Sequence, residues 1–292
     1  MAKRRRSNTI DRQTLFLIIT VFIVGIGIGL FFGKRAATVS KIAPARERVE
    51  ETRETLRQKR SFFAPFFWGF AKKGPPKIAI VIDDVGNDDN LKDVLWSFPH
   101  TVTLAIIPKL PRSEYFSTEG KKHGFEIILH QPMEPIRPVG EDDATMIKVK
   151  MSDRDIAEIL GSNLQSVASA VGMNNHMGSL ATQDERVMQV VLSELKKRGL
   201  FFLDSLTTSR SVCRKAANVV KLPYLARDVF LDNEMEPDYI HGQIEQLAQT
   251  ARKMGSAIGI GHYKWNTLVV LKEEIARLEA QGFQIVTLRD LL

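Results

Sequence analysis

The residues in this sequence that are best suited to chemistry are acidic and imidazole side chains that directly follow apolar runs. Asp83 and Asp84 end the run KIAIVIDD, and His130, His176 and His262 end three later runs. Two neighbouring carboxylates repel each other, so we expect a cation or a proton beside them. One carboxylate and two imidazoles with an open position form the ligand set that a catalytic divalent metal such as zinc takes. The sequence therefore predicts a metal site.

The elements that would position these residues begin with the apolar run at 77–84. Its five consecutive apolar residues, mostly β-branched, predict a strand buried on both faces. Further strands are expected at 101–107, 125–130, 172–176, 200–204, 224–231, 256–262 and 283–288, and helices at 90–98, 113–123, 152–171, 183–198, 237–254 and 267–281. Alternating strands and helices predict an α/β fold with a parallel sheet, and seven or eight strands favour closure into a barrel. An open doubly wound sheet is the alternative.

Polar residues at the carboxyl ends of parallel strands meet at one edge of the sheet, where ligands bind. Besides the residues named above, the strand ends carry Pro108, Asp204, and Arg227 with Asp228 or Asp232. The remaining three histidines, His100, His123 and His241, fall at helix or loop positions, where we expect them to be solvated. A single histidine at a strand end could equally be a hydrogen-bonded core residue. Three together favour a site.

The amino-terminal third has the pattern of a membrane anchor. Residues 15–33 are 19 consecutive residues without a charge, about enough to cross a bilayer core. The basic segment 1–14 predicts a cytoplasmic amino terminus, which places the folded domain on the periplasmic or other extracytoplasmic side of the inner membrane. A cleaved signal peptide is the alternative, but its apolar region usually has about 7–15 residues and a small-residue cleavage site. Here the run is longer and ends in Lys34 and Arg35, which favours an uncleaved anchor.

Two further features precede the folded domain. Gly25, Gly29 and Gly33 lie four residues apart on one helical face, a pattern that permits a homodimer through close helix packing. Residues 34–76 form a highly charged linker with an aromatic cluster near its end, and Pro75 and Pro76 mark the boundary to the domain at 77–292. The aromatic cluster could pack on the domain or lie on the membrane surface.

The charge of the chain excludes one class of partner. Residues 1–75 carry 16 Lys and Arg against 5 Asp and Glu, whereas residues 76–292 carry 25 against 29, which together give the net charge of +7. The basic excess therefore belongs to the amino-terminal region, and the mildly acidic domain is not expected to bind nucleic acid. Cys213 is the single cysteine, so the chain has no intramolecular disulfide.

Five motifs carry a family resemblance. They are KIAIVIDDVG, ILHQPMEP at 128–135, NNHMGS at 174–179, FFLDS at 201–205 and GIGH at 259–262, in that order. In this order they resemble the divergent polysaccharide deacetylases, a branch of the metal-dependent carbohydrate esterases. The resemblance covers 77–292 and implies a distorted (β/α) barrel, a bound divalent metal, most simply Zn²⁺, and removal of acetyl groups from an envelope polysaccharide or glycan.

The resemblance also implies roles for individual residues. Asp83 matches the catalytic base, Asp84 the metal-binding aspartate and His130 the first metal-binding histidine. The wider family has its second histidine four residues further on, where this chain has Glu134. Either His176 or Glu134 could replace it, and we favour His176 because an imidazole keeps the ligand type.

Three further matches complete the expected site. His262 resembles the histidine that protonates the leaving group. Asp204 would orient a histidine, and Arg227 would hold a carboxylate ionised. After GIGH the chain continues YKWNTL, where a proline-rich turn would be expected. Together with the missing histidine spacing, the altered turn supports a catalytically silent glycan-binding or envelope scaffold protein as the alternative function. A third hypothesis is a metal hydrolase of another acyl or phosphoryl substrate. A phosphoryl enzyme would need a Gly-rich loop or several Arg or Lys residues at the strand ends, and only Arg227 clearly lies there.

Overall fold

The computed structural model describes residues 74–137 and 144–292. The expected anchor at 15–33, the glycine face inside it and the linker up to residue 73 lie outside the described residues. Within the described part of the chain, no helix combines the length and the apolar character needed to cross a membrane.

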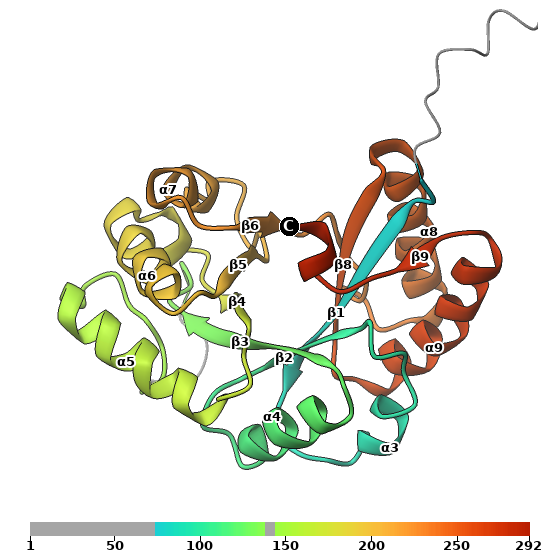
Figure 1. The fold of residues 1–292 in the computed structure, drawn as a ribbon, viewed down its shortest axis with the longest axis horizontal. Helices are drawn as coiled ribbons and strands as arrows, with labels where there is room; N and C mark the ends of the chain where they lie inside the picture. Colours follow the sequence, from blue (N-terminus) through green and yellow to red (C-terminus); the bar gives the residue numbers. More distant parts are fainter. Residues whose placement is uncertain (1–73, 138–143) are drawn as a thin grey trace, which may run out of the picture. The chain divides into compact units, whose positions relative to one another are not determined.

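Strands and helices alternate along the described chain (Figure 1). The strands are β1 (Lys77–Val85), β2 (Thr103–Ile106), β3 (Glu126–Met133), β4 (Gly172–Met177), β5 (Phe201–Asp204), β6 (Tyr224–Ala226), β7 (Val229–Phe230), β8 (Ser256–His262) and β9 (Gln284–Ile285). The helices are α3 (Lys92–Leu95), α4 (Ser113–Lys122), α5 (Asp153–Ser166), α6 (Glu185–Lys197), α7 (Cys213–Val220), α8 (Pro237–Met254) and α9 (Trp265–Ala280), with short 3₁₀ turns η2 (Ala181–Gln183) and η3 (Arg289–Leu291).

The strands form one parallel sheet, as the alternation of elements predicts. Its order is β6-β5-β4-β3-β2-β1-β8-β7, and β9 pairs with the start of β1. Every pairing is parallel, so the carboxyl ends of all strands lie at one edge of the sheet, here called the rim. No backbone ladder joins β6 to β7 within the described residues. The fold is therefore a (β/α) barrel that curves without closing.

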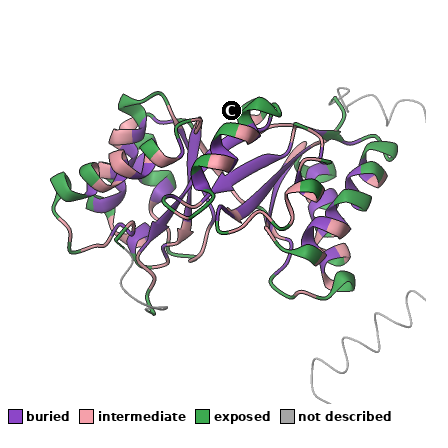
Figure 2. Ribbon diagram, turned by 90° about the horizontal axis from the view of Figure 1, so that it is seen from below, coloured by how far each residue is buried: buried purple, intermediate pink, exposed green. Residues whose placement is uncertain are grey.

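Each face of the curved sheet has its own apolar core. In β1, Ile78, Ile80 and Ile82 face the helices, whereas Ala79 and Val81 face the inner side. The helices cover the outer face, and the C-terminal segment with η3 lies against the inner face (Figure 1). Both faces of the strands are accordingly buried (Figure 2). Burying each large aliphatic side chain stabilises the fold by about 1.5–3 kcal/mol, which holds the strand ends in fixed positions.

The C-terminal segment is held inside the barrel by a buried carboxylate. Glu126, at the start of β3, accepts hydrogen bonds from Thr103 Oγ1 and from the backbone N–H of Leu288, both at 2.8 Å. Burial raises the pKa of Glu126, and these hydrogen bonds oppose that rise. Leu288 thereby packs into the inner core. The C-terminal segment therefore covers part of the inner face near the amino-terminal ends of the strands.

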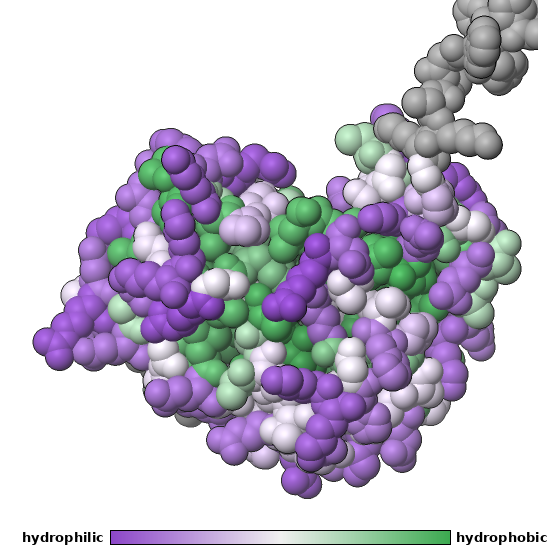
Figure 3. Space-filling model, viewed as in Figure 1, coloured by the Kyte–Doolittle hydropathy of each residue, from purple (hydrophilic) through white to green (hydrophobic). Residues whose placement is uncertain are grey.

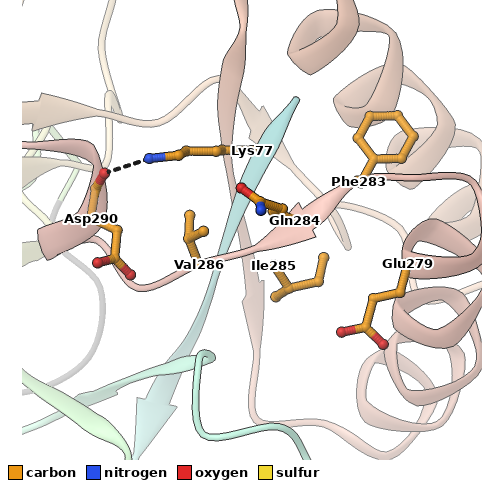
Figure 4. Close-up of a pocket in the computed structure, with 7 residues that line it drawn as sticks. All are labelled: Lys77, Glu279, Phe283, Gln284, Ile285, Val286 and Asp290. Carbon is orange, nitrogen blue, oxygen red and sulfur yellow. Dashed lines mark hydrogen bonds between the residues drawn. The ribbon is translucent and has the colours of Figure 1, made fainter. Parts of the chain in front are cut away.

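Two hollows flank the C-terminal segment at the amino-terminal end of the strands. One, of about 540 Å³, lies beside β9, where Lys77 Nζ donates a hydrogen bond to the carbonyl oxygen of Asp290 at 3.3 Å (Figure 4). The other, of about 400 Å³, has an apolar lining that includes Phe201 and Leu292. Hydrophobic side chains gather around the C-terminal segment on this face (Figure 3). Neither hollow is near the carboxyl ends of the strands.

The structure corrects two expectations about local structure. The single strand expected at 224–231 is two short strands, because Arg227 N donates to the carbonyl of Asp204 whereas Asp228 N donates to that of Ile258. The chain thus changes its partner from β5 to β8 within two residues. Helix α7 was not expected from the sequence, and several predicted helices begin or end a few residues from their observed bounds.

Candidate metal centre and active site

The two aspartates near the end of β1 both approach His130 Nε2, but their backbones differ. Asp83 is 2% exposed, and its carbonyl oxygen accepts a hydrogen bond from Tyr263 N. Asp84 has a φ of 62°, a left-handed conformation that is uncommon for a residue other than glycine. Strain of that kind is often found where a functional side chain must be directed at a site. Here it accompanies the convergence of Asp84 with two histidines.

Asp84, His130 and His176 come together at the rim. Asp84 Oδ1 lies 3.2 Å from His130 Nε2 and 3.1 Å from His176 Nδ1, and the two imidazole nitrogens lie 3.2 Å apart. All candidate ligand atoms of the three residues lie within 4.8 Å of one another. The sequence predicted these residues at three strand ends, and in the structure their side chains meet at a common point.

An unsatisfied oxygen indicates what the cluster could hold. Asp84 Oδ1 is buried and makes no hydrogen bond of acceptable geometry despite its two close nitrogen neighbours. A buried carboxylate oxygen needs a positively charged partner, which the two imidazoles in their protonated form or a bound cation can supply. One carboxylate oxygen and two imidazole nitrogens also match the donor set of an open zinc site. The residues present therefore fit a divalent cation.

Asn174, to which the sequence assigned no role, fixes the orientation of His130. Its Oδ1 lies 2.8 Å from His130 Nδ1, and its Nδ2 donates to Asp83 Oδ1 at 2.9 Å and to Ser205 Oγ at 3.3 Å. Because the amide nitrogen already donates to Asp83, Asn174 Oδ1 accepts a hydrogen bond from His130 Nδ1–H. The lone pair of His130 is then left on Nε2, which faces the cluster. The direct register of His130 with Asn174 across β3 and β4 was the signal that could have found it.

The turn after β4 explains the NNHMGS motif. Met177 and Gly178 both have positive φ, 54° and 87°, and a Cβ at Gly178 would lie 2.9 Å from Met133 Cβ. Asn175 Nδ2 donates to the carbonyl of Met177 at 2.7 Å. The chain can therefore turn away immediately beyond His176, whose side chain stays at the rim.

Glu134, the alternative third ligand, lies outside the cluster. Its Oε2 accepts a hydrogen bond from Val149 N at 2.7 Å, and its backbone oxygen accepts from Leu180 N and Ala181 N. The side chain thus anchors the segment that follows residue 144. It is not among the clustered His, Cys, Asp and Glu residues found in the described chain.

His262 lies next to Asp83 in the register of β8 with β1, and its ring contacts a second carboxylate, that of Asp232. Asp232 Oδ1 lies 2.7 Å from His262 Nδ1, and Asp232 Oδ2 accepts from His262 N at 2.8 Å and from Thr267 Oγ1 at 2.6 Å. Burial alone would lower the pKa of His262, but Asp232 outweighs burial and raises it. Asp232 thus favours the protonated form of His262.

The expected role of Asp204 is wrong. Its carboxylate accepts hydrogen bonds from Leu206 N, Ser211 Oγ and Tyr224 OH, and it orients no histidine among the described residues. It holds the loop after β5 instead. Asp232, which the sequence offered only as one of two candidates beside Arg227, contacts the histidine.

Arg227 also differs from its expected role. Its Nε and Nη2 donate to the carbonyls of Ser205 and Leu206 at 2.7 and 3.1 Å, and within the described chain it forms no ion pair with a carboxylate. Its guanidinium lies 3.7 Å from the centroid of the Phe230 ring, which is stacked on His262. Arg227 therefore links the ends of β5 and β7 and supports the wall beside His262.

The charges of the cluster explain its electrostatics. Burial raises the pKa of Asp83 despite the opposing influence of His130 and His262. Burial also acts to raise the pKa of Asp84, but His130 and His176 outweigh it and hold that pKa well below its usual range. For His130, burial is outweighed by Asp83 and Asp84, which raise its pKa to about 8. The two adjacent carboxylates therefore stabilise a positive charge at the centre.

The fold and these side chains define a class: a parallel (β/α) protein with an Asp-His-His centre at the rim, flanked by a buried aspartate and a carboxylate-paired histidine. Residues 80–292 match the family model described as divergent polysaccharide deacetylase. The chain therefore belongs to the divergent polysaccharide deacetylase family, as its motifs predicted.

Individual proteins are similar to much of this chain. An uncharacterized protein of Haemophilus influenzae is 36% identical over 215 residues, covering 74% of this chain and 76% of its own. The uncharacterized protein YibQ of Escherichia coli is 33% identical over 202 residues, covering 69% of this chain and 63% of its own, so the match spans less than two thirds of that relative. The crystal structure of the uncharacterized protein ATU2773 from Agrobacterium tumefaciens C58 has a TM-score of 0.72 at 21% identity, covering 76% of this chain and 92% of that one, and shares the fold.

Proposed function

We propose that this chain is a metal-dependent hydrolase that removes acetyl groups from a polysaccharide or other glycan of the cell envelope. The observation that carries the proposal is the convergence of Asp84, His130 and His176, with the unsatisfied Asp84 oxygen among them. Membership of a polysaccharide deacetylase family supports the substrate class.

Asp84, His130 and His176 would hold the cation, and the mix of imidazole and carboxylate favours zinc. A divalent cation bound there would lower the pKa of a water molecule and polarise the acetyl carbonyl. His130 would bind through Nε2, because Asn174 holds the proton on Nδ1, and His176 through Nδ1, the nitrogen that faces the cluster.

Asp83 would act as the general base. Asn174 donates to its Oδ1, while its Oδ2 lies 3.5 Å from His130 Nε2 and therefore faces the cluster. Its raised pKa makes it a better proton acceptor than an ordinary aspartate. Asp83 would take a proton from the attacking water as the water oxygen bonds to the acetyl carbon.

His262 would act as the general acid. Asp232 favours its protonated form, and Phe230 supports one face of its ring. His262 would give its proton to the departing nitrogen or oxygen of the sugar as the bond from that atom to the acetyl carbon breaks. The products are acetate and a free amine or hydroxyl.

The location of the domain is part of the proposal. An uncleaved anchor at 15–33 would hold the amino terminus in the cytoplasm and the domain at 77–292 in the periplasm. The uncharged run and the basic residues before it support this orientation. An envelope glycan would then be within reach of the rim.

Acetate release from acetylated glycans by the zinc-loaded full-length chain tests the proposed activity. We expect release by the wild type and loss of release in Asp83→Asn with metal content unchanged. A chain that binds zinc but releases acetate from no acetylated glycan would instead be the catalytically silent scaffold, which Glu134 at the expected histidine position favours.

A further inference from the structure

The face of the domain opposite the rim is rich in positive charge, although the domain as a whole is mildly acidic. Each helix that connects two parallel strands runs back from the rim, so its last turn lies at the amino-terminal ends of the strands. The last turns of α4, α6 and α8 contain the cations Lys121, Lys122, Lys196, Lys197, Arg252 and Lys253. The first turns of α4, α5, α6 and α8 contain the acids Glu114, Asp153, Asp155, Glu185 and Asp238. Charge is thus separated along the barrel axis, and we call the positive end the basal face.

Some of these cations have no carboxylate partner. Lys121, Lys253 and Lys221, which is the C-cap of α7, are exposed and form no ion pair with the described residues. Lys196 Nζ donates to the carbonyl of Val220 at 2.6 Å, a neutral acceptor that leaves its charge uncompensated. Cations in the last turn also stabilise a helix, so charge alone does not indicate a ligand. A second feature of the basal face does.

Large apolar side chains are exposed among these cations. Val219 near the end of α7 and Met254 at the end of α8 are each 65% exposed, and Leu292 is 53% exposed. The helix dipole gives no reason to place apolar side chains there. Cations together with exposed apolar side chains are typical of protein surfaces that lie on an anionic membrane, where lysines meet the lipid phosphates and apolar groups enter the headgroup region.

The C-terminal segment and its two hollows join these groups into one surface. Lys77 lines the larger hollow, and Lys196, Arg289 and Leu292 line the smaller one. The backbone N–H of Lys77 donates to the carbonyl of Gly255 at 3.0 Å, which links the start of β1 to the end of α8. Hydrophobic side chains are gathered around the C-terminal segment (Figure 3). The basal face is therefore continuous from α8 to α6.

The chain enters the described domain on the same face. Gly74 and Pro75 are exposed and lead directly into β1 at Lys77. The charged linker that follows the proposed anchor at 15–33 thus joins the domain at its basal face and not at the rim. A bilayer that holds the anchor is consequently a surface that this face can reach.

We propose that the basal face docks on a bilayer surface that contains anionic phospholipid, with its lysines at the lipid phosphates and Val219, Met254 and Leu292 in the headgroup region. The rim then faces away from the lipid. β1 alone spans nine residues at about 3.3 Å each, so the Asp84 centre near its far end lies well above the membrane. The inference goes beyond the proposed hydrolysis and does not depend on it, since it concerns the opposite end of the barrel.

Fluorescence of the full-length chain in lipid vesicles tests the docking. An environment-sensitive label is attached at Met254→Cys on the basal face or at Trp265→Cys, a 58% exposed position at the start of α9 on the rim side. Cys213 is buried and stays unlabelled. In vesicles of phosphatidylcholine with phosphatidylglycerol, we expect nitroxide-bearing lipid to quench the label at residue 254 strongly and the label at residue 265 weakly. In phosphatidylcholine alone, both labels should be quenched weakly.

Charge variants identify the interaction that drives docking. In the double variant Lys221→Gln and Lys253→Gln, each lost cation should lower the ratio of docked to undocked chains about fivefold. Lys150→Gln is the matched control, because Lys150 is exposed just before α5, at the opposite end of the barrel, and should leave quenching unchanged. Raising the salt concentration to about 1 M, where the Debye length is about 3 Å, should release the wild-type face.

Three outcomes would overturn the inference. Equal quenching of the two labels would show that the basal face has no preference for lipid. Quenching at residue 254 that is the same with and without phosphatidylglycerol would remove the role of the cations. Energy transfer between chains labelled at residue 254, without quenching by lipid, would assign the face to contacts between copies of this chain. Acetate release bears on none of these outcomes, so loss of the hydrolase proposal would leave the docking test intact.

Discussion

His130, three residues before the end of β3, and His262, the last residue of β8, both lie beside Asp83, but the Nδ1 atoms of their rings have different partners. His130 Nδ1 meets the amide oxygen of Asn174 at 2.8 Å, whereas His262 Nδ1 meets the carboxylate of Asp232 at 2.7 Å. A neutral amide fixes the tautomer without adding charge, and a carboxylate also stabilises the protonated ring. The difference suits His130 to present a lone pair to a cation and His262 to donate a proton.

The same comparison explains why His130 has a raised pKa although the partner of its Nδ1 atom is neutral. Asp83 and Asp84 raise it to about 8 against the effect of burial. In the absence of a cation, a proton on His130 supplies the positive charge that two carboxylates demand. A divalent cation would replace that proton, so metal affinity should weaken as the pH falls below about 8.

Removing either imidazole ring of the cluster should have the largest effect on zinc affinity. We expect His130→Ala and His176→Ala to lose at least about 100-fold in zinc affinity, because each removes a ligand, whereas loss of an outer-shell partner typically costs only about 10–100-fold. Equilibrium dialysis against a competing chelator measures the affinity. Glu134→Ala is the matched control and should keep the metal, since Glu134 contacts Val149. Metal loss in Glu134→Ala with retention in His176→Ala would contradict the assignment.

Removing the other histidine should leave the metal and slow the reaction. We expect His262→Ala to keep wild-type zinc content and to lose about 100- to 10,000-fold in kcat, the usual contribution of a general acid. Acetate release and elemental analysis on the same preparation measure the two effects. Loss of zinc in this variant would show that the two histidines do not differ in role.

Removing the partner of His130 should have a smaller effect on metal binding. Asn174→Ala frees the ring to adopt the wrong tautomer, and we expect zinc affinity to fall by about 10- to 100-fold. Ser205→Ala is the control, because Ser205 Oγ contacts Asn174 at 3.3 Å without touching the histidine. Equal affinities in the two variants would remove Asn174 from the account of the site.

Removing the charge beside His262 should shift a pH profile. Asp232 raises the pKa of His262, so the acid stays protonated, and active, to higher pH than an ordinary buried histidine. In Asp232→Asn we expect the basic limb of kcat to move to lower pH, with zinc affinity unchanged. Asp228→Asn, whose carboxylate accepts from Ile258 N at 2.8 Å, is the control and should keep the wild-type limb.

The sequence predicted the parallel fold and assigned five polar residues at strand ends to the site, because apolar runs and their ends follow local rules. It missed Asn174 and misassigned Asp204, because their contacts depend on which residues face each other across β3, β4 and the loop after β5. The split between β6 and β7 was missed for a similar reason. Arg227 and Asp228 pair with different strands because the sheet curves between them, and this curvature cannot be read from the local sequence.

The most direct test of the central claim is the identity of the side chains that touch a bound ion. X-ray absorption spectroscopy at the zinc edge, applied to the zinc-loaded full-length chain, measures the types of ligand. Elemental analysis measures the number of zinc ions per chain. We expect a single ion per chain with two imidazole nitrogens and one carboxylate, and the loss of one imidazole in His176→Ala. A chain that takes up no zinc, or whose zinc ligands are unchanged in His176→Ala, would contradict the metal centre at the rim.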